Sequence, residues 1–151
     1  METVARNLSQ PDITVGIRLL ARLARLAEQV CQTTGISLPQ YRLLVSISGD
    51  PQRASELATR VGVSRPTLTS LVDGLEQAGL LRRVPVPTDR RGIQLVATNA
   101  GRDAVERADA ALTDRMFQLV SADTALMARD VIQELCTALD AEGASQVASS
   151  H

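Results

Sequence analysis

The sequence predicts a mainly α-helical fold that contains one small β-hairpin. Apolar residues recur at helical spacing along most of the 151 residues, and two helical segments are joined by a tight turn, Gly62-Val63-Ser64. Only between residues 80 and 97 does the pattern become extended, with Val, Leu and Ile on both sides of a polar turn. Because Tyr41 and Phe117 are the only aromatic residues, the core must be aliphatic.

Two helices are expected before residue 50. From Asp12 to Cys31 the apolar residues form a broad stripe at helical spacing, and Gly35 can end this helix. The segment Ser37-Leu38-Pro39-Gln40 has the pattern of a capping box with a proline in the first turn, so a second helix should begin here. It should run to about Ser48, before Gly49-Asp50-Pro51.

The next two helices form a helix-turn-helix pattern. A short helix is expected from Ala54 to Val61 and a longer one from Arg65 to Ala78. Ser64 is a good N-cap for the longer helix, and Gly79 suits the left-handed position after its end. The apolar residues fall where two helices crossing at a tight turn would bury them: Leu57, Ala58, Val61, Val63, Leu68, Leu71, Val72 and Leu75.

A hairpin and two further helices should complete the chain. The segments from Leu80 to Val86 and from Gly92 to Ala97 flank the turn Pro87-Thr88-Asp89-Arg90-Arg91, which predicts a β-hairpin with a basic tip. Thr98 or Asn99 should cap a long helix, and Ser121 a last helix that runs to about residue 138. Residues 142–151 are small and polar, and we expect them to be disordered.

The charge is distributed unevenly, although the net charge is only −1. Residues 1–92 hold 12 Arg and 8 acidic residues, whereas residues 93–151 hold 4 Arg and 9 acidic residues. A mildly basic front joined to an acidic back is the distribution expected for a DNA-facing module on a separate assembly module. Every basic residue is Arg, so contacts to phosphate would be made by guanidinium groups.

Several classes of function are excluded or disfavoured. The only histidine is His151, which leaves no Ser-His-Asp triad and no His-based zinc site, and the sequence contains neither a P-loop nor a GxGxxG motif. We therefore expect no enzyme, no cofactor and no metal. No apolar run approaches the roughly 20 residues that span a bilayer, and the N-terminus lacks the apolar core of a signal peptide, so a cytoplasmic protein is expected.

The helix-turn-helix points to double-stranded DNA as the partner. The second helix of such a motif enters the major groove with its N-terminal residues nearest the base edges. The residues expected to bind there are Ser64, Arg65, Pro66, Thr67, Thr69 and Ser70. An arginine can donate two parallel hydrogen bonds to the O6 and N7 of a guanine. The hairpin could insert Arg90 and Arg91 into a flanking minor groove, with Asp89 orienting a guanidinium.

These segments resemble the MarR family of regulators. The runs Leu38-Pro39-Gln40-Tyr41, Ser55-Glu56-Leu57-Ala58 and Val61 to Glu76 are similar to its helix-turn-helix core, and Pro87 to Arg91 is similar to its wing. The resemblance covers roughly residues 13–140. It implies a winged helix-turn-helix homodimer in which the first and last helices of both chains interlock over a pseudo-palindromic operator.

The resemblance also implies how such a regulator works. Repression is the default, and a small lipophilic or anionic effector would bind between the dimerisation helices and the winged domain and release the protein from DNA. Members of the family often carry a basic residue where Ser70 and Gly74 stand, so fewer DNA contacts are expected here.

The apolar stripes support a dimer independently of the resemblance. The first and last predicted helices carry more apolar surface than the winged region could cover, and such surfaces normally mark an interface. The expected organisation is an N-terminal dimerisation helix (1–36), a winged helix-turn-helix region (37–98), C-terminal dimerisation helices (99–141) and a disordered tail (142–151).

Two alternative functions remain open. Cys31 could make the protein a redox-sensing regulator, although it lies at the end of the first helix and not at the start, where the helix dipole would favour a thiolate. The winged region could instead be a protein-interaction module. In that case Arg65, Arg90 and Arg91 could be neutralised without any loss of DNA affinity.

Overall fold

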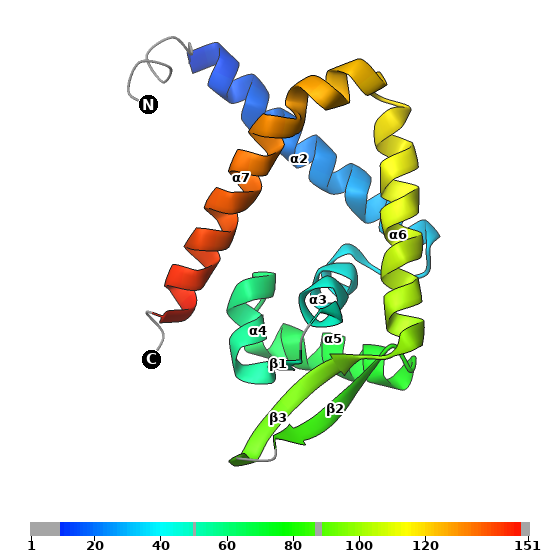
Figure 1. Cartoon of the computed structure of the whole chain (residues 1–151), viewed down its shortest axis with the longest axis vertical. Helices are drawn as coiled ribbons and strands as arrows, with labels where there is room; N and C mark the ends of the chain where they lie inside the picture. The colour runs from blue at the N-terminus through cyan, green and yellow to red at the C-terminus, as the bar shows by residue number, and fades with distance from the viewer. Residues whose placement is uncertain (1–9, 50, 87–88, 149–151) are drawn as a thin grey trace.

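The computed structural model describes residues 10–49, 51–86 and 89–148, and Figure 1 shows a mainly helical chain with a small antiparallel sheet. The helices are α2 (Gln10–Thr33), α3 (Leu38–Ser48), α4 (Ala54–Val61), α5 (Arg65–Gln77), α6 (Asn99–Phe117) and α7 (Ala122–Ala148). The strands are β1 (Gln52–Arg53), β2 (Leu81–Val86) and β3 (Asp89–Ala97), in the order β1-β3-β2. The predicted fold class, mainly α with a β-hairpin wing, is confirmed.

The helix ends lie where local chemistry predicts them. The hydroxyls of Ser37, Ser64 and Thr98 cap α3, α5 and α6. Each accepts a hydrogen bond from the backbone N–H of the residue three positions later. Gly35 and Gly79 follow α2 and α5 with φ of +89° and +72°, a left-handed conformation that glycine adopts without a steric penalty. Local sequence signals are therefore sufficient to place these ends.

Three elements differ from the expectation. Strand β3 begins at Asp89 and not at Gly92, because Asp89 still pairs with Val86 of β2, so Asp89, Arg90 and Arg91 belong to the strand and not to the turn. Strand β1 was not predicted, because its two residues are too few to show an alternating pattern; it pairs with Leu95 and Gln94 of β3. Helix α7 continues to Ala148, although residues 142–151 were expected to be disordered. Gly143 is the least favourable residue for a helix in this stretch, which holds no proline, and one glycine costs about 1 kcal/mol, so the helix can continue. Residues 149–151 lie outside the described residues.

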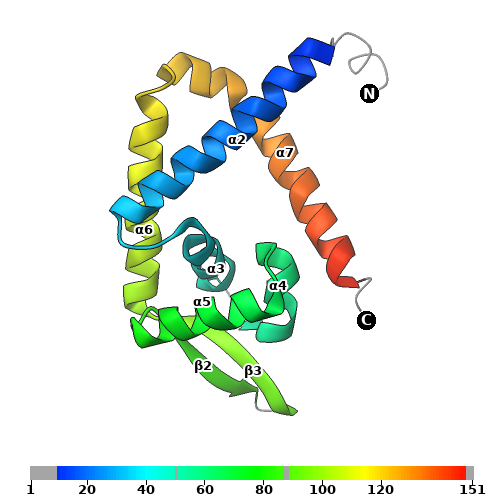
Figure 2. The same cartoon turned by 180° about the vertical axis from the view of Figure 1, so that it is seen from behind.

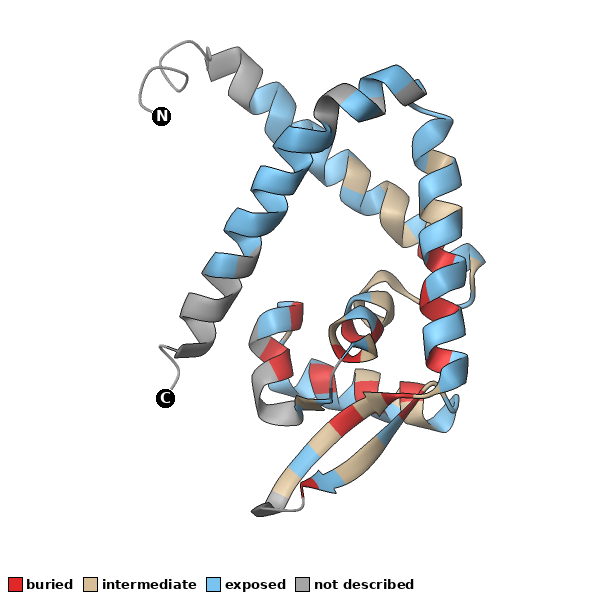
Figure 3. Ribbon diagram, in the orientation of Figure 1, coloured by how far each residue is buried: buried red, intermediate tan, exposed pale blue. Residues whose placement is uncertain are grey.

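The core is formed by residues 37–98, called the winged part below, together with the first half of α6. Figure 3 shows the buried residues gathered on α3, α4, α5, the sheet and the first half of α6. The largest fully buried side chains there are aliphatic: Leu43, Leu44, Ile47, Leu57, Leu75, Leu81, Leu95 and Val61. Each buried leucine stabilises the fold by about 1.5–3 kcal/mol relative to an exposed one. This core fixes α5 and the hairpin against α3.

Helix α2 and the second half of α6 extend away from this core, and α7 turns back toward α4, as Figure 2 shows from behind. Large apolar side chains on α2 and α7 are exposed in the single chain: Val15, Ile17, Leu19, Leu20, Leu126, Val131, Ile132, Leu135 and Leu139. Within the described residues, no helix combines the length and apolar character needed to cross a membrane.

Two hydrogen bonds join α2 and α6 to the winged part. Glu28 Oε2 on α2 accepts the N–H of Leu38 at the start of α3, over 3.2 Å. The Tyr41 hydroxyl on α3 donates to Asp109 Oδ1 on α6, over 2.5 Å. Burial and this hydrogen bond raise the pKa of Tyr41 above its ordinary value, so the phenol keeps its proton. The first turn of α3 is thereby tied to α2 and to α6.

A close backbone contact fixes the start of α6. A Cβ atom added to Gly101 would lie 2.0 Å from the carbonyl oxygen of Leu80 and 3.4 Å from Cδ2 of Leu44. Here α6 approaches the chain just after α5 more closely than any side chain allows. The same carbonyl of Leu80 accepts the N–H of Thr98 over 3.1 Å.

Substitution of Gly101 by alanine should therefore destabilise the protein, by about 1–3 kcal/mol or more, because the added methyl collides with backbone atoms that cannot move freely. Chemical denaturation should show a lower unfolding midpoint. Gly49→Ala is the matched control, since Gly49 has a φ of −78° and its added Cβ would meet nothing within 4 Å. Equal midpoints for the two variants would contradict this account.

Candidate nucleic-acid interface

Helix α5 presents its polar face to solvent at the outer edge of the winged part. Leu68, Val72 and Leu75 are buried against the core. All six residues that the sequence singled out on this helix and its N-cap are exposed: Ser64, Arg65, Pro66, Thr67, Thr69 and Ser70. The structure therefore brings these predicted residues together on one accessible surface.

The hydroxyls on this surface already make local hydrogen bonds. Ser64 Oγ and Thr67 Oγ1 lie 2.7 Å apart and share a hydrogen bond, while Ser64 Oγ also accepts the Thr67 N–H. Thr69 Oγ1 donates to the carbonyl of Arg65 over 3.1 Å, and Ser70 Oγ donates to that of Pro66 over 3.3 Å. To donate to another acceptor, Thr69 and Ser70 must give up these bonds.

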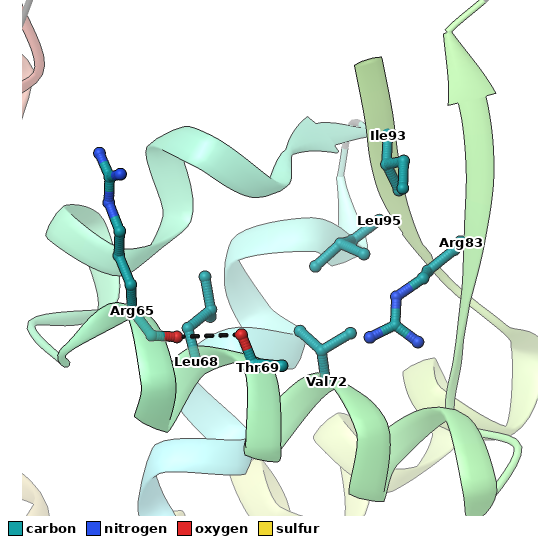
Figure 4. Close-up of a pocket in the computed structure, with 7 residues that line it drawn as sticks. All are labelled: Arg65, Leu68, Thr69, Val72, Arg83, Ile93 and Leu95. Carbon is teal, nitrogen blue, oxygen red and sulfur yellow. Dashed lines mark hydrogen bonds between the residues drawn. The ribbon is translucent and has the colours of Figure 1, made fainter. Parts of the chain in front are cut away.

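The guanidinium of Arg65 is the strongest donor on this face. Its side chain is exposed and, in Figure 4, points away from the other labelled side chains. A guanidinium presents a planar set of N–H donors that matches both a phosphate and the O6–N7 edge of guanine. Arg65 is therefore placed to make directional contacts without first breaking a hydrogen bond to its own helix.

The hairpin forms the second part of the candidate interface. Strands β2 and β3 pair from Leu81 opposite Ala97 to Pro85 opposite Ile93, with an irregular register between Pro85 and Val86. The predicted residues Asp89, Arg90 and Arg91 begin β3 at the far end of this hairpin, and their side chains lie outside the described part of the structure. Pro87 and Thr88 also lie outside it.

A hollow of about 320 Å³ separates α5 from the hairpin, as Figure 4 shows. It is lined by Arg65, Leu68, Thr69, Val72, Arg83, Ile93 and Leu95. The middle of this lining is apolar, and the two arginines come from different elements: one from the start of α5 and one from β2. The hairpin thus contacts α5 at its root, and the gap opens between them.

Sequence reasoning missed the contacts of Arg83. Its Nη2 lies 2.5 Å from Asp73 Oδ1, its Nη1 donates to Glu76 Oε2, and its backbone N–H donates to Glu76 Oε1 over 3.2 Å. The hydrogen bond to Asp73 is the main cause that raises the pKa of Arg83 above its ordinary value. The partners lie seven and ten residues earlier, on another element, so only the fold brings them together.

Comparison with known proteins identifies the family. The sequence profile of the MarR family matches residues 34–92. The regulator PecS of Dickeya dadantii is 29% identical over 104 residues, which cover 65% of this chain and 63% of PecS. A putative regulatory protein for the hcr operon of Thauera aromatica is 32% identical over 94 residues, which cover 62% of this chain and 57% of that protein. Residues 34–92 of this chain are a MarR-family region.

Solved structures of MarR-family proteins share the fold. Wild-type MarR from E. coli, without ligand, superposes with a TM-score of 0.72 at 22% identity, over 85% of this chain and 98% of that one. CouR bound to a 23-mer DNA duplex gives 0.67 at 24% identity, over 89% and 99%. CouR from Rhodococcus jostii RHA1 bound to p-coumaroyl-CoA gives 0.64 at 26% identity, over 84% and 95%.

The matches to the curated relatives cover only part of their length. The chain spans only about three fifths of the length of the two curated relatives. The family consists of transcriptional regulators and not of enzymes, which agrees with the prediction that the chain has no catalytic site. Among the described residues, no group of three His, Cys, Asp or Glu side chains is placed to hold a metal ion.

Cys31 is poorly placed for redox sensing. Its side chain is 0% exposed at the end of α2. Burial raises the pKa of this thiol, and the charges of Glu28 and Asp109 raise it further. The reactive form of cysteine is the thiolate, which this environment disfavours. Cys136, on α7, is exposed in the single chain.

We expect Cys31 to be inert in the folded protein. In a Cys136→Ser variant, which leaves Cys31 as the only thiol, a thiol-specific chromophoric reagent at pH 7 should react only after denaturant is added. Labelling of one thiol per chain in the same variant after unfolding is the control for the reagent. Rapid labelling of Cys31 without denaturant would show that the thiol is accessible and would reopen the redox alternative.

Proposed function

We propose that this protein is a homodimeric transcription regulator that binds a specific pseudo-palindromic site in double-stranded DNA, represses transcription there, and is released by a small-molecule effector. The observation that carries this proposal is the exposed N-terminal face of α5, with Arg65 on it, beside a hairpin whose tip has the sequence Asp89-Arg90-Arg91. In the proposal, residues 37–98 bind DNA and the helices on either side hold the dimer together.

The two surfaces would divide the work of DNA binding. A helix such as α5 fits the major groove, where Arg65 could read a guanine and the methyl group of Thr69 could meet a thymine. The hairpin would reach the flanking minor groove, whose negative potential attracts an inserted arginine. The solved structure of CouR bound to a 23-mer DNA duplex, which has the same fold, supports DNA binding by this fold.

The exposed apolar side chains support the dimer. Leu126 is 76% exposed and Leu139 is 65% exposed in the single chain, and further apolar residues on α2 and α7 are open to water. Apolar surface removed from water contributes about 25 cal/mol per Å², so a second copy covering these helices would be strongly favoured. Two-fold symmetry would also let two α5 helices enter successive major grooves about 34 Å apart.

An effector would act by changing the spacing of the two winged parts. The hydrogen bonds between Leu38 and Glu28 and between Tyr41 and Asp109 join α3 to α2 and α6, so a movement of these two helices would reach the winged part. The structure of CouR with p-coumaroyl-CoA supports the idea that a lipophilic or anionic molecule is the signal. Release by a ligand requires that it binds the DNA-free arrangement more tightly.

Substitution of the two key arginines tests DNA binding. Arg91→Ala should weaken binding to matched and scrambled duplexes alike, whereas Arg65→Ala should also reduce the difference between them, each by about 1–3 kcal/mol. Fluorescence anisotropy with an operator selected by the wild-type protein from random duplexes would measure both. Arg107→Ala, which removes an exposed arginine from α6, is the control and should bind like the wild type.

The same titration, run across a salt series, separates the alternatives. A steep loss of affinity with salt and a preference for the selected duplex are expected of a DNA-reading regulator. Unchanged affinity after both substitutions would instead favour a protein-interaction module.

Substitution on α7 tests the dimer. Leu135→Glu places a charge on the exposed apolar stripe and should convert the dimer into monomers with much weaker operator binding, because a buried unpaired charge is costly. Light scattering after size exclusion would give the mass. Gln133→Glu, on the polar side of the same helix, is the matched control and should remain dimeric. A dimeric Leu135→Glu protein would argue against this interface.

A further inference from the structure

We propose that Arg83 is a positioning residue for DNA binding: it clamps the root of the hairpin to α5 and so sets where the hairpin tip meets DNA. This inference rests on the proposed function. It assigns to Arg83 a task different from that of the arginines expected to touch DNA.

The clamp joins one strand residue to two consecutive turns of α5. Asp73 and Glu76 are three residues apart and therefore lie on the same side of the helix. Arg83 Nη2 lies 2.5 Å from Asp73 Oδ1, Nη1 donates to Glu76 Oε2, and the backbone N–H donates to Glu76 Oε1 over 3.2 Å. The planar guanidinium holds both acceptors in a fixed relative geometry, which a lysine ammonium would not do.

The charge of this group argues against a direct phosphate contact. One guanidinium faces two carboxylates, so the trio carries a net charge of −1 and repels a phosphate. The Arg83 side chain is only 33% exposed, and in Figure 4 its guanidinium is directed toward α5. Both terminal nitrogens of the guanidinium already donate to carboxylates of α5.

Strand β3 provides a second contact that holds the root of the hairpin. Arg83 pairs in register with Leu95 of β3, which is 0% exposed and packs into the core. Leu95 therefore anchors one strand of the hairpin through apolar contacts, while Arg83 anchors the other through charge. Together the two contacts restrict rotation of the hairpin about its root.

A small rotation at the root of the hairpin produces a larger displacement at its tip, so this restriction matters for DNA binding. Val86 lies three residues beyond Arg83, or about 10 Å at roughly 3.3 Å per strand residue. A rotation of about 10° at the root would therefore move the end of β2 by about 2 Å. Hydrogen bonds to bases and phosphates tolerate only a few tenths of an ångström, so a loosened root would lose the contacts made by the tip.

A double-mutant cycle between Arg83 and Arg91 tests this inference. If Arg83 acts by holding the hairpin, Arg83→Ala should weaken operator binding about 10-fold in the wild type but less than 2-fold once Arg91→Ala has removed the tip contact. Arg83→Lys should recover little of the loss, because lysine cannot hold both carboxylates. Arg82→Ala, one residue earlier on an exposed position of β2, is the control and should combine additively with Arg91→Ala.

Removal of a carboxylate distinguishes the two roles by the sign of its effect. Asp73→Ala should weaken operator binding if the clamp positions the hairpin, whereas it should strengthen binding if Arg83 is a phosphate contact that Asp73 merely neutralises. Hydrogen exchange of the free protein adds a readout without DNA: in Arg83→Ala, amides of β2 and β3 should exchange faster while those of α3 stay unchanged. The melting temperature should change little, because exposed ion pairs add little to global stability.

The failures of the two proposals are distinguishable. If the wild type selects and binds an operator but the effects of Arg83→Ala and Arg91→Ala are additive, or if Asp73→Ala tightens binding, the positioning role of Arg83 is wrong and the regulator stands. If hairpin exchange is unchanged in Arg83→Ala, the positioning role is also wrong. A wild type that binds no duplex at all would defeat the proposed function together with the role of Arg83 in it.

Discussion

The contact between the start of α6 and the chain just after α5 is the constraint on which the rest of this structure depends. Helix α5 ends at Gln77, β2 begins at Leu81, β3 ends at Ala97 and α6 begins at Asn99, so four elements meet within a few residues. The Leu80 carbonyl accepts a hydrogen bond from the N–H of Thr98, and its oxygen lies only 2.0 Å from the position that a Cβ of residue 101 would take. This junction therefore links the candidate recognition helix, the hairpin and a long helix of the proposed dimer in a single rigid contact.

The candidate DNA surface is built from few groups. Most hydroxyls on the first turns of α5 bond to their own helix, and Arg83 bonds to two carboxylates of α5. The strong donors with freedom to reach outward are therefore fewer than the arginine content of the region suggests. A surface of this kind depends on accurate placement, which the aliphatic core and the Arg83 clamp provide.

Helices α2 and α7 differ from the winged part in where their apolar side chains lie. Their apolar side chains are exposed in the single chain, whereas the winged part buries its own. Burial of apolar surface is the main favourable contribution to association, so these helices are suited to contact with a second copy. Two hydrogen bonds, one between the ends of α2 and α3 and one between α3 and α6, connect the two regions and give an effector a physical route to the DNA surface.

The sequence by itself determined the features that are set within a few residues: the helix caps, the left-handed glycines and the exposed polar face of α5, which follow from local spacing and side-chain chemistry. Only the tertiary structure decided the features that join distant segments. The two-residue strand β1 exists because β3 offers it a partner, and the burial of Cys31 and the pairing of Arg83 with Asp73 and Glu76 depend on which elements pack together. Sequence spacing carries no record of such contacts, because burial of the core brings the partners together and the chain between them does not.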